Sequence, residues 1–215
     1  MGQSKKKIAL NRLDSKSRLH ELPIPIIGLT GGISTGKSTV AKILREKGLA
    51  VINADELVKR IYKQEETIKY IQKNYPDVFK DGEIFFPRLR EKVFKDHFVK
   101  KDIEDLIYSK LPSAFMMAVK EFKDPKFIIY DVPLLFEKNL QGLCDLTIVV
   151  YAPSHIQKTR LLKRDGSSED VAQAIIDQQM DIEQKKLMAD FIIDNSQTES
   201  ELYLGVKNFL DLINV

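Results

Sequence analysis

Short apolar runs alternate along the chain with longer stretches in which apolar residues recur at every third or fourth position. The runs lie at residues 24–30, 49–52, 126–130, 145–151 and 190–193. Apolar runs of this length, bounded by glycine or polar residues, are typical of strands that are buried on both faces. Strands that alternate with helices favour a parallel sheet with helices around it. The pattern therefore predicts an α/β fold with a doubly wound, parallel five-stranded sheet.

The stretch after the first predicted strand has a clear helical pattern. Val40, Ile43 and Leu44 share one face of a helix over residues 37–47, and Gly48 ends it as a C-terminal glycine does.

The second and third predicted strands are far apart in the sequence. Between them the pattern predicts a helix over residues 55–73, a turn near Asp81-Gly82 and two or more helices over residues 89–122. So much helix is more than a plain crossover needs, which predicts a helical insert over about 56–122 that binds a substrate. A second helical and charged excursion covers about 155–186.

Composition narrows the class of protein. The chain has 215 residues, 43% hydrophobic and 30% charged, which fits one domain with an insert. The net charge of +3 is too small to indicate nucleic acid, and no apolar run approaches the roughly 18 residues of a membrane helix. The single cysteine, Cys144, cannot form a bridge within the chain, which fits a reducing cytoplasm. We expect a cytoplasmic protein without nucleic-acid or membrane partners, and its oligomeric state stays open.

Residues 1–23 are polar and basic, and they predict a flexible N-terminal extension ahead of a domain over residues 24–215. The run Lys5-Lys6-Lys7 is compatible with a nucleic-acid or membrane surface, but a solvated tail is the favoured interpretation.

A phosphate-binding motif follows the first predicted strand and opens the first predicted helix. Gly31 to Ser38 fits G-x-x-x-x-G-K-[ST] at every fixed position. The two glycines let backbone N–H groups approach phosphates, Lys37 reaches the β and γ phosphates, and Ser38 offers a hydroxyl to Mg²⁺. Ser34 and Thr35 occupy variable positions and have no visible base, so neither is a candidate nucleophile. The predicted nucleotide-contacting residues here are Gly31, Gly32, Ile33, Ser34, Thr35, Gly36, Lys37, Ser38 and Thr39.

Carboxylates follow two of the predicted strands, at the edge where ligands bind in a doubly wound sheet. Asp55 comes just after the second strand, where it can take a proton from an attacking hydroxyl or simply cap the next helix. Asp131 ends the third strand and is predicted to hold Mg²⁺ together with Ser38. Glu137 is a candidate for the acceptor side, or a surface carboxylate.

The second excursion carries Arg160 and Arg164, which share a face of a helix because they stand four residues apart. Guanidinium groups match phosphate oxygens and stabilise the charge of transfer, so beside a phosphate loop they predict a catalytic lid. The other interpretation is a solvated amphipathic helix.

Several classes of phosphate-loop protein are compatible with the motif alone. A GTPase switch would need N-K-x-D and D-x-x-G elements, and the sequence has neither. A remodelling ATPase would normally be larger than this chain. A small-molecule kinase fits the length, the insert and the arginine-bearing lid, while a non-catalytic nucleotide-binding module stays open.

Five stretches together resemble one family. They read IIGLTGGISTGKSTVAKIL, VINAD, DVPLLFE, TRLLKRDG and QMDIEQKKLMADFIIDN. With these stretches together, the chain is similar to the dephospho-coenzyme A kinases from about Ile24 to near its C-terminus. DVPLLFE and the final ADFIIDN are more specific to this family than the phosphate loop is.

The resemblance implies a P-loop kinase that uses ATP and Mg²⁺ to phosphorylate the 3′-hydroxyl of dephospho-coenzyme A, the last step of coenzyme A synthesis. It implies that Asp55 acts as the base, that Arg160 and Arg164 belong to a closing lid, and that Asn195 lies near the adenine of ATP. It also implies that the helical insert binds the acceptor.

The chain departs from the family pattern in four places, mostly in the insert and the lid. Asn53 stands where the family usually has the first Asp of Asp-x-Asp, and Phe85-Phe86 replaces an Asp-Arg pair. Tyr108-Ser109 replaces His-Pro, and Ile175 replaces an arginine. A kinase for another small alcohol or nucleotide, or a weakly active relative, is therefore the alternative interpretation.

Overall fold

The computed structural model describes residue 10 and residues 12–213. The basic run at Lys5-Lys6-Lys7 lies outside the described residues. The chain divides into two compact units, the first formed by the residues up to Asn53 and from Phe122 onward, the second by Ala54–Glu121.

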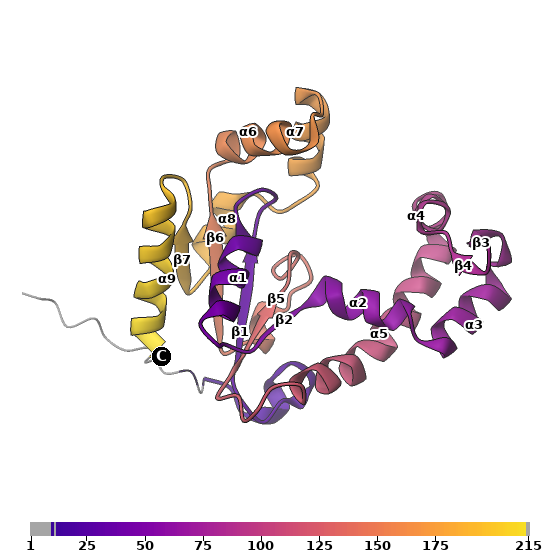
Figure 1. Cartoon of the computed structure of the whole chain (residues 1–215), viewed down its shortest axis with the longest axis horizontal. Helices are drawn as coiled ribbons and strands as arrows, with labels where there is room; N and C mark the ends of the chain where they lie inside the picture. The colour runs from indigo at the N-terminus through magenta and orange to yellow at the C-terminus, as the bar shows by residue number, and fades with distance from the viewer. Residues whose placement is uncertain (1–9, 11, 214–215) are drawn as a thin grey trace, which may run out of the picture. The chain divides into compact units, whose positions relative to one another are not determined.

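The first unit is built on a parallel five-stranded sheet (Figure 1). Its order is β2-β5-β1-β6-β7, so the chain adds strands on one side of β1 and then on the other. The fold predicted from the apolar runs is confirmed. The strand bounds are β1 Ile26–Gly31, β2 Val51–Asn53, β5 Ile128–Asp131, β6 Leu146–Tyr151 and β7 Phe191–Asp194.

Helices α1 (Lys37–Glu46) and α9 (Glu199–Ile213) pack on one face of this sheet (Figure 1). The buried core there joins Leu44 of α1 and Phe209 of α9 to apolar side chains of all five strands. On the other face, the Cβ that Gly28 lacks would meet Leu135 and Cys144. Every residue of β1 and β6 is buried, which explains why these strands read as continuous apolar runs.

Three helices occupy the predicted excursion over 155–186: α6 (Ser154–Asp165), α7 (Glu169–Asp177) and α8 (Ile182–Met188). Gly166 ends α6 in the left-handed conformation, with φ at 63°. The side chain of Ser168 caps α7, and that of Asp181 caps α8.

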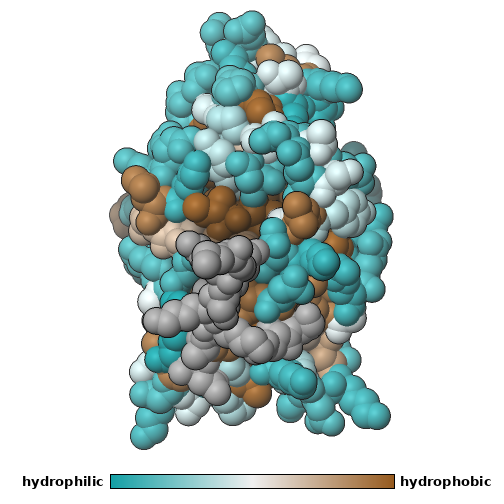
Figure 2. All heavy atoms as spheres, turned by 90° about the vertical axis from the view of Figure 1, so that its left-hand side faces the viewer, coloured by the Kyte–Doolittle hydropathy of each residue, from teal (hydrophilic) through white to brown (hydrophobic). Residues whose placement is uncertain are grey.

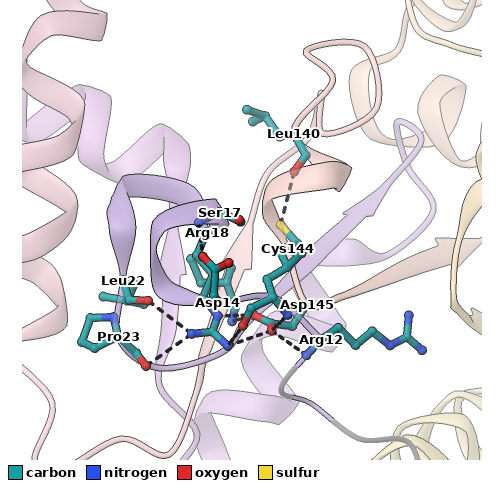
Figure 3. Close-up of polar contacts among 11 residues, drawn as sticks. Arg12, Asp14, Ser17, Arg18, Leu22, Pro23, Leu140, Cys144 and Asp145 are labelled. Atoms are coloured by element: carbon teal, nitrogen blue, oxygen red, sulfur yellow. Dashed lines mark hydrogen bonds and ion pairs between the residues drawn. The ribbon is translucent and has the colours of Figure 1, made fainter.

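Residues 12–22 belong to the segment predicted to be a flexible extension, but in the structure they fold against the start of β6. They contain two short 3₁₀ turns, η1 (Ser15–Ser17) and η2 (Leu19–Glu21), and between them Arg18 is buried against Asp145 (Figure 3). Arg18 Nε donates to Asp145 Oδ2 at 2.7 Å, and Nη2 donates to Oδ1 at 3.0 Å. A polar segment can be ordered in this way because Arg18 has a fully buried counterion.

The carboxylate of Asp145 also accepts backbone hydrogen bonds from three N–H groups, those of Arg12, Leu13 and Ile26. Burial alone would raise the pKa of Asp145, but the hydrogen bonds from Arg18 and from the backbone outweigh it, and the pKa is lowered. Asp145 therefore joins the segment 12–18 to β1 and β6.

The second unit is mainly helical. The predicted helix over 55–73 is broken after Tyr62, so that α2 and α3 replace it, and the predicted turn at Asp81-Gly82 closes a two-stranded hairpin. Both turn residues have positive φ, 53° and 83°. The elements are α2 Ala54–Tyr62, α3 Glu65–Asn74, η3 Pro76–Val78, β3 Phe79–Lys80, β4 Glu83–Ile84, α4 Phe86–Lys95 and α5 His97–Val119.

The surface seen from the α9 side is hydrophilic over most of its area, with apolar side chains gathered in a band (Figure 2). Ile192 of β7 and Leu204 of α9 are among the exposed apolar residues of the first unit. Among the described residues, no helix combines the length and the apolar character needed to cross a membrane.

Candidate functional site

The carboxyl ends of the parallel strands meet at one edge of the sheet, and the predicted phosphate loop lies there. The sheet order reverses at β1, so this edge is the switch point at which doubly wound sheets bind ligands. Gly31 ends β1 and Lys37 begins α1, which directs the N-terminus of α1 toward the loop. Gly36 caps the helix at φ 91° and ψ 17°, a left-handed conformation that favours glycine.

Lys37, Asp131 and Asn53 form a chain of polar contacts beside the loop. The ammonium of Lys37 pairs with Oδ1 of Asp131, and the side-chain amide of Asn53 donates to Oδ2 at 2.6 Å. Asn53 and Asp131 are register partners at the ends of β2 and β5, which explains their close approach. The carboxylate of Asp131 is 2% exposed, so its charge acts where water screens it weakly.

The loop backbone is also held by side chains from the C-terminal part of the chain. Asn195 donates from Nδ2 to the carbonyl oxygen of Thr35 at 2.8 Å. Arg160 donates to the carbonyl oxygens of Asn195 at 2.8 Å and of Ser34 at 3.5 Å. Arg160 and Asn195 thus lie at the loop, whereas the predicted contact of Asn195 with adenine stays a prediction.

Two glutamines that the sequence did not single out contact the same loop. The N–H of Ile33 donates to Oε1 of Gln179 at 2.8 Å. Gln157 is 2% exposed, and its side chain occupies the place that a Cβ on Gly32 would need. Both glutamines line a cavity of about 290 Å³ between the loop and the segment around α7 and α8.

Ser34 is the strained position of the loop. Its φ is 56°, a conformation that side chains rarely adopt, and its hydroxyl is buried without a hydrogen-bond partner in the described part of the chain. Within the described residues no group is in hydrogen-bond contact with this hydroxyl, and the expectation that Ser34 is not a nucleophile stays a prediction.

Other predicted site residues have exposed side chains. Ser38 and Thr39 lie in the first turn of α1, and Asp55 lies in the first turn of α2, inside the helix of the second unit rather than ahead of it. Arg164, one turn beyond Arg160, pairs with the neighbouring Asp165 at 2.6 Å, and this hydrogen bond raises the pKa of Arg164. The structure thus brings Arg160, but not Arg164, into contact with the loop.

Glu137 contacts a buried lysine of α8. Its Oε1 lies 2.7 Å from Nζ of Lys185 and accepts the N–H of Met180 at 3.1 Å. One sign of the buried lysine can be found in the sequence, because Lys185 follows Ile182 by three residues and both share one face of a short helix.

The described residues bear on two kinds of chemistry, attack by a thiol and binding of a metal ion. Burial raises the pKa of the Cys144 thiol to about 12, so the thiol is protonated at neutral pH and is a poor nucleophile. No group of three or more histidine, cysteine or carboxylate side chains within residues 12–213 is arranged to hold a metal. The hydroxyl of Ser38 and the carboxylate of Asp131 are hard oxygen donors, which suits Mg²⁺ bound mainly by phosphates and water.

Comparison with known proteins agrees with this geometry. The model of the dephospho-CoA kinase family matches residues 25–201. The dephospho-CoA kinase of Fusobacterium nucleatum subsp. nucleatum is 37% identical over 196 residues, which are 89% of this chain and 100% of that protein.

Solved structures are also similar to the chain. The crystal structure of TT1252 from Thermus thermophilus has a TM-score of 0.78 and 29% identity, covering 87% of this chain and 97% of that one. The dephospho-CoA kinase from Campylobacter jejuni has a TM-score of 0.64 and 28% identity, with 87% and 96% covered. The predicted resemblance and the P-loop kinase fold are confirmed.

Proposed function

Because the chain belongs to the dephospho-CoA kinase family, we propose that it transfers the γ-phosphoryl group of ATP to the 3′-hydroxyl of dephospho-coenzyme A. This transferase reaction is the last step of coenzyme A synthesis. One observation carries the proposal: a complete phosphate loop ends β1 with Lys37 paired to the strand-end Asp131. In phosphoryl transfer the protein contributes mainly positioning and electrostatic stabilisation, for which this arrangement is suited.

On the donor side, the loop N–H groups and the N-terminus of α1 bind the phosphates of ATP. The ammonium of Lys37 exchanges part of its contact with Asp131 for the β and γ phosphates. Ser38 and Asp131 would hold Mg²⁺, which supplies charge neutralisation for the phosphates when bound. Asp131 then has two roles, since it orients Lys37 and provides an oxygen for the metal.

The lid contributes positive charge. Arg160 already contacts the carbonyl oxygens of Ser34 and Asn195, so its guanidinium lies beside the loop that would bind the phosphates. We propose that the moving part covers α6 and α7 and that Arg164 joins the site only on closure. Helix α8 is anchored through the buried Lys185, which supports a lid shorter than the predicted 155–186.

On the acceptor side, Asp55 receives the proton of the 3′-hydroxyl as the hydroxyl oxygen attacks the γ-phosphorus. The bond between the γ-phosphorus and the bridging oxygen breaks, and ADP leaves. Support for this role comes from the position of Asp55, two residues after Asn53, whose amide contacts Asp131. The carboxylate of Asp55 is exposed in the first turn of α2, and a carboxylate oxygen is a group that can take a proton from a hydroxyl.

The second unit has a pocket that fits such an acceptor. Its volume is about 790 Å³ and its walls are mostly apolar, including Tyr62, Phe86 and Tyr108, while its charged residues are Arg90, Lys100 and Glu104. Apolar walls with an excess of cations over carboxylates suit a molecule with a long uncharged arm and anionic phosphates. Phe86 and Tyr108 are departures from the family pattern, so the acceptor contacts here differ from the usual ones.

The test is incubation of the protein with ATP, Mg²⁺ and dephospho-coenzyme A, followed by detection of coenzyme A by mass. Omission of Mg²⁺ tests the metal requirement. A parallel panel with shikimate and nucleoside monophosphates tests the alternative acceptors. No coenzyme A at high enzyme concentration, with turnover of another acceptor, would overturn the assignment.

A further inference from the structure

Lys185 is buried where three segments of the first unit meet. Its side chain is 0% exposed, and it forms an ion pair with Oε1 of Glu137 at 2.7 Å. Its Nζ also donates to the carbonyl oxygens of Gly31 and Pro133, both at 3.3 Å. An ammonium group has three donors, and all three have an acceptor here.

The two carbonyl groups belong to different halves of the nucleotide site. Gly31 ends β1 and is the first residue of the phosphate loop. Pro133 follows Asp131 by two residues, and its carbonyl oxygen also accepts from the hydroxyl of Thr30 at 3.0 Å. Lys185 therefore joins the start of the loop to the segment that carries the Asp131 carboxylate.

Glu137 supplies the charge that a buried ammonium requires. Its Oε1 accepts the N–H of Met180, while its Oε2 is buried and accepts no hydrogen bond from any described residue. An apolar pair of similar volume would usually stabilise the fold as well as such an ion pair does. A lysine has one property that an apolar side chain lacks, which is that it can fix the separation of two carbonyl groups.

We propose that Lys185 is a positioning residue for phosphoryl transfer, because its buried ammonium holds the carbonyl groups of Gly31 and Pro133 together and so keeps the phosphate loop in register with Asp131. The inference rests on the proposed function for its turnover readout, and its binding readout needs only ATP.

The experiment separates charge balance from positioning with two variants. Lys185→Met removes the donors and leaves the Glu137 carboxylate buried without its cation, whereas Lys185→Met combined with Glu137→Leu removes both charges. For each variant we would measure the melting temperature, the Kd for MgATP, and kcat and KM for ATP with dephospho-coenzyme A as the acceptor. Lys207→Met, at an exposed lysine of α9, is the matched control.

Lys185→Met is expected to have both a lower melting temperature and a lower kcat/KM than the native chain. The double variant is expected to recover its melting temperature, while kcat/KM for ATP stays about tenfold or more below that of the native chain, because a displacement of about 1 Å can cost up to about a hundredfold. Recovery of both melting temperature and kcat/KM in the double variant would overturn the proposal, since the pair would then be only structural.

Lys185→Arg keeps the test decisive if both methionine variants fail to fold. Arginine retains the charge beside Glu137, but its planar group is larger than an ammonium and must displace one of the two carbonyl groups. We expect the Kd for MgATP to rise several-fold, by analogy with other substitutions at bidentate or tightly packed sites. An unchanged Kd and kcat would overturn the proposal.

Failure of the proposed function has a different signature. If the native chain binds MgATP but forms no coenzyme A, the acceptor assignment is wrong, and the Kd values for the variants still decide the role of Lys185.

Discussion

The side-chain amide of Asn53 donates a 2.6 Å hydrogen bond to Oδ2 of Asp131, its register partner on the neighbouring strand. The other oxygen of Asp131 contacts the ammonium of Lys37. An amide at position 53 is a neutral donor, so it orients the carboxylate without adding charge. The family usually has a carboxylate at this position, and the effect of that difference can be predicted.

Asn53→Asp would set two carboxylates side by side, and they would repel each other until a cation or proton is shared between them. We expect the free energy of unfolding without Mg²⁺ to fall by about 1–2 kcal/mol, and the Mg²⁺ concentration for half-maximal turnover to fall several-fold. Thermal unfolding and a Mg²⁺ titration of kcat measure these effects. Asn53→Ala is the control, because it removes the hydrogen bond without adding a charge, and a similar Mg²⁺ dependence in both variants would contradict the explanation.

Asp55→Asn keeps the size of the side chain and removes its ability to accept a proton. We expect kcat to fall by about 10²–10⁴-fold, the typical contribution of a general base, while the Kd for MgATP is unchanged. Steady-state kinetics and nucleotide binding check the two parts separately. Glu56→Gln, on the same helical turn, should leave kcat within about threefold. Normal turnover of Asp55→Asn would contradict the role of Asp55 as a base and would mean that this carboxylate only stabilises the start of α2.

Gly36→Ala tests the contact between the loop and Asn195. An alanine there has two costs, since φ is 91° and the new Cβ would meet the side-chain amide of Asn195. Gly48→Ala isolates the first cost, because φ is 80° and nothing lies within 4 Å of the new Cβ. We expect Gly48→Ala to lower stability by about 1–2 kcal/mol with normal ATP affinity. Gly36→Ala should also raise the Kd for MgATP by about tenfold or more, because the displaced loop misplaces its N–H groups.

Much of the first unit was predictable because parallel strands bury both faces and leave a clear apolar run. The phosphate loop was predictable as well, since its glycines and lysine serve a local geometry. The break in the helix predicted over 55–73 was not, because Lys63 and Gln64 are ordinary helix formers and packing within the second unit decides it. The burial of Lys185 and Arg18 was not predicted, because a buried charge depends on a counterion far away in the sequence, Glu137 or Asp145.

The Arg18–Asp145 pair predicts how the ordered part of the N-terminal segment contributes to stability. The side chains are 4% and 0% exposed, so Arg18→Met would leave the Asp145 carboxylate buried without its cation. Removing one partner of a buried pair typically costs about 3–5 kcal/mol, which we expect as the loss in the free energy of unfolding. Arg12→Met is the matched control, because Arg12 pairs with Asp190 at an exposed site, where such pairs contribute about 0–1 kcal/mol.

The same pair predicts a dependence on pH. The pKa of Asp145 is lower in the folded chain than its ordinary value of about 3.9, so folding favours the ionised carboxylate. The stabilisation is therefore fully present above about pH 4–5 and is lost as the pH falls through the folded pKa. Urea unfolding between about pH 3 and 7 should show that the difference between the native chain and Arg18→Met shrinks at the acidic end. A difference that stays constant over this range would mean that Arg18 acts through packing rather than through the Asp145 charge.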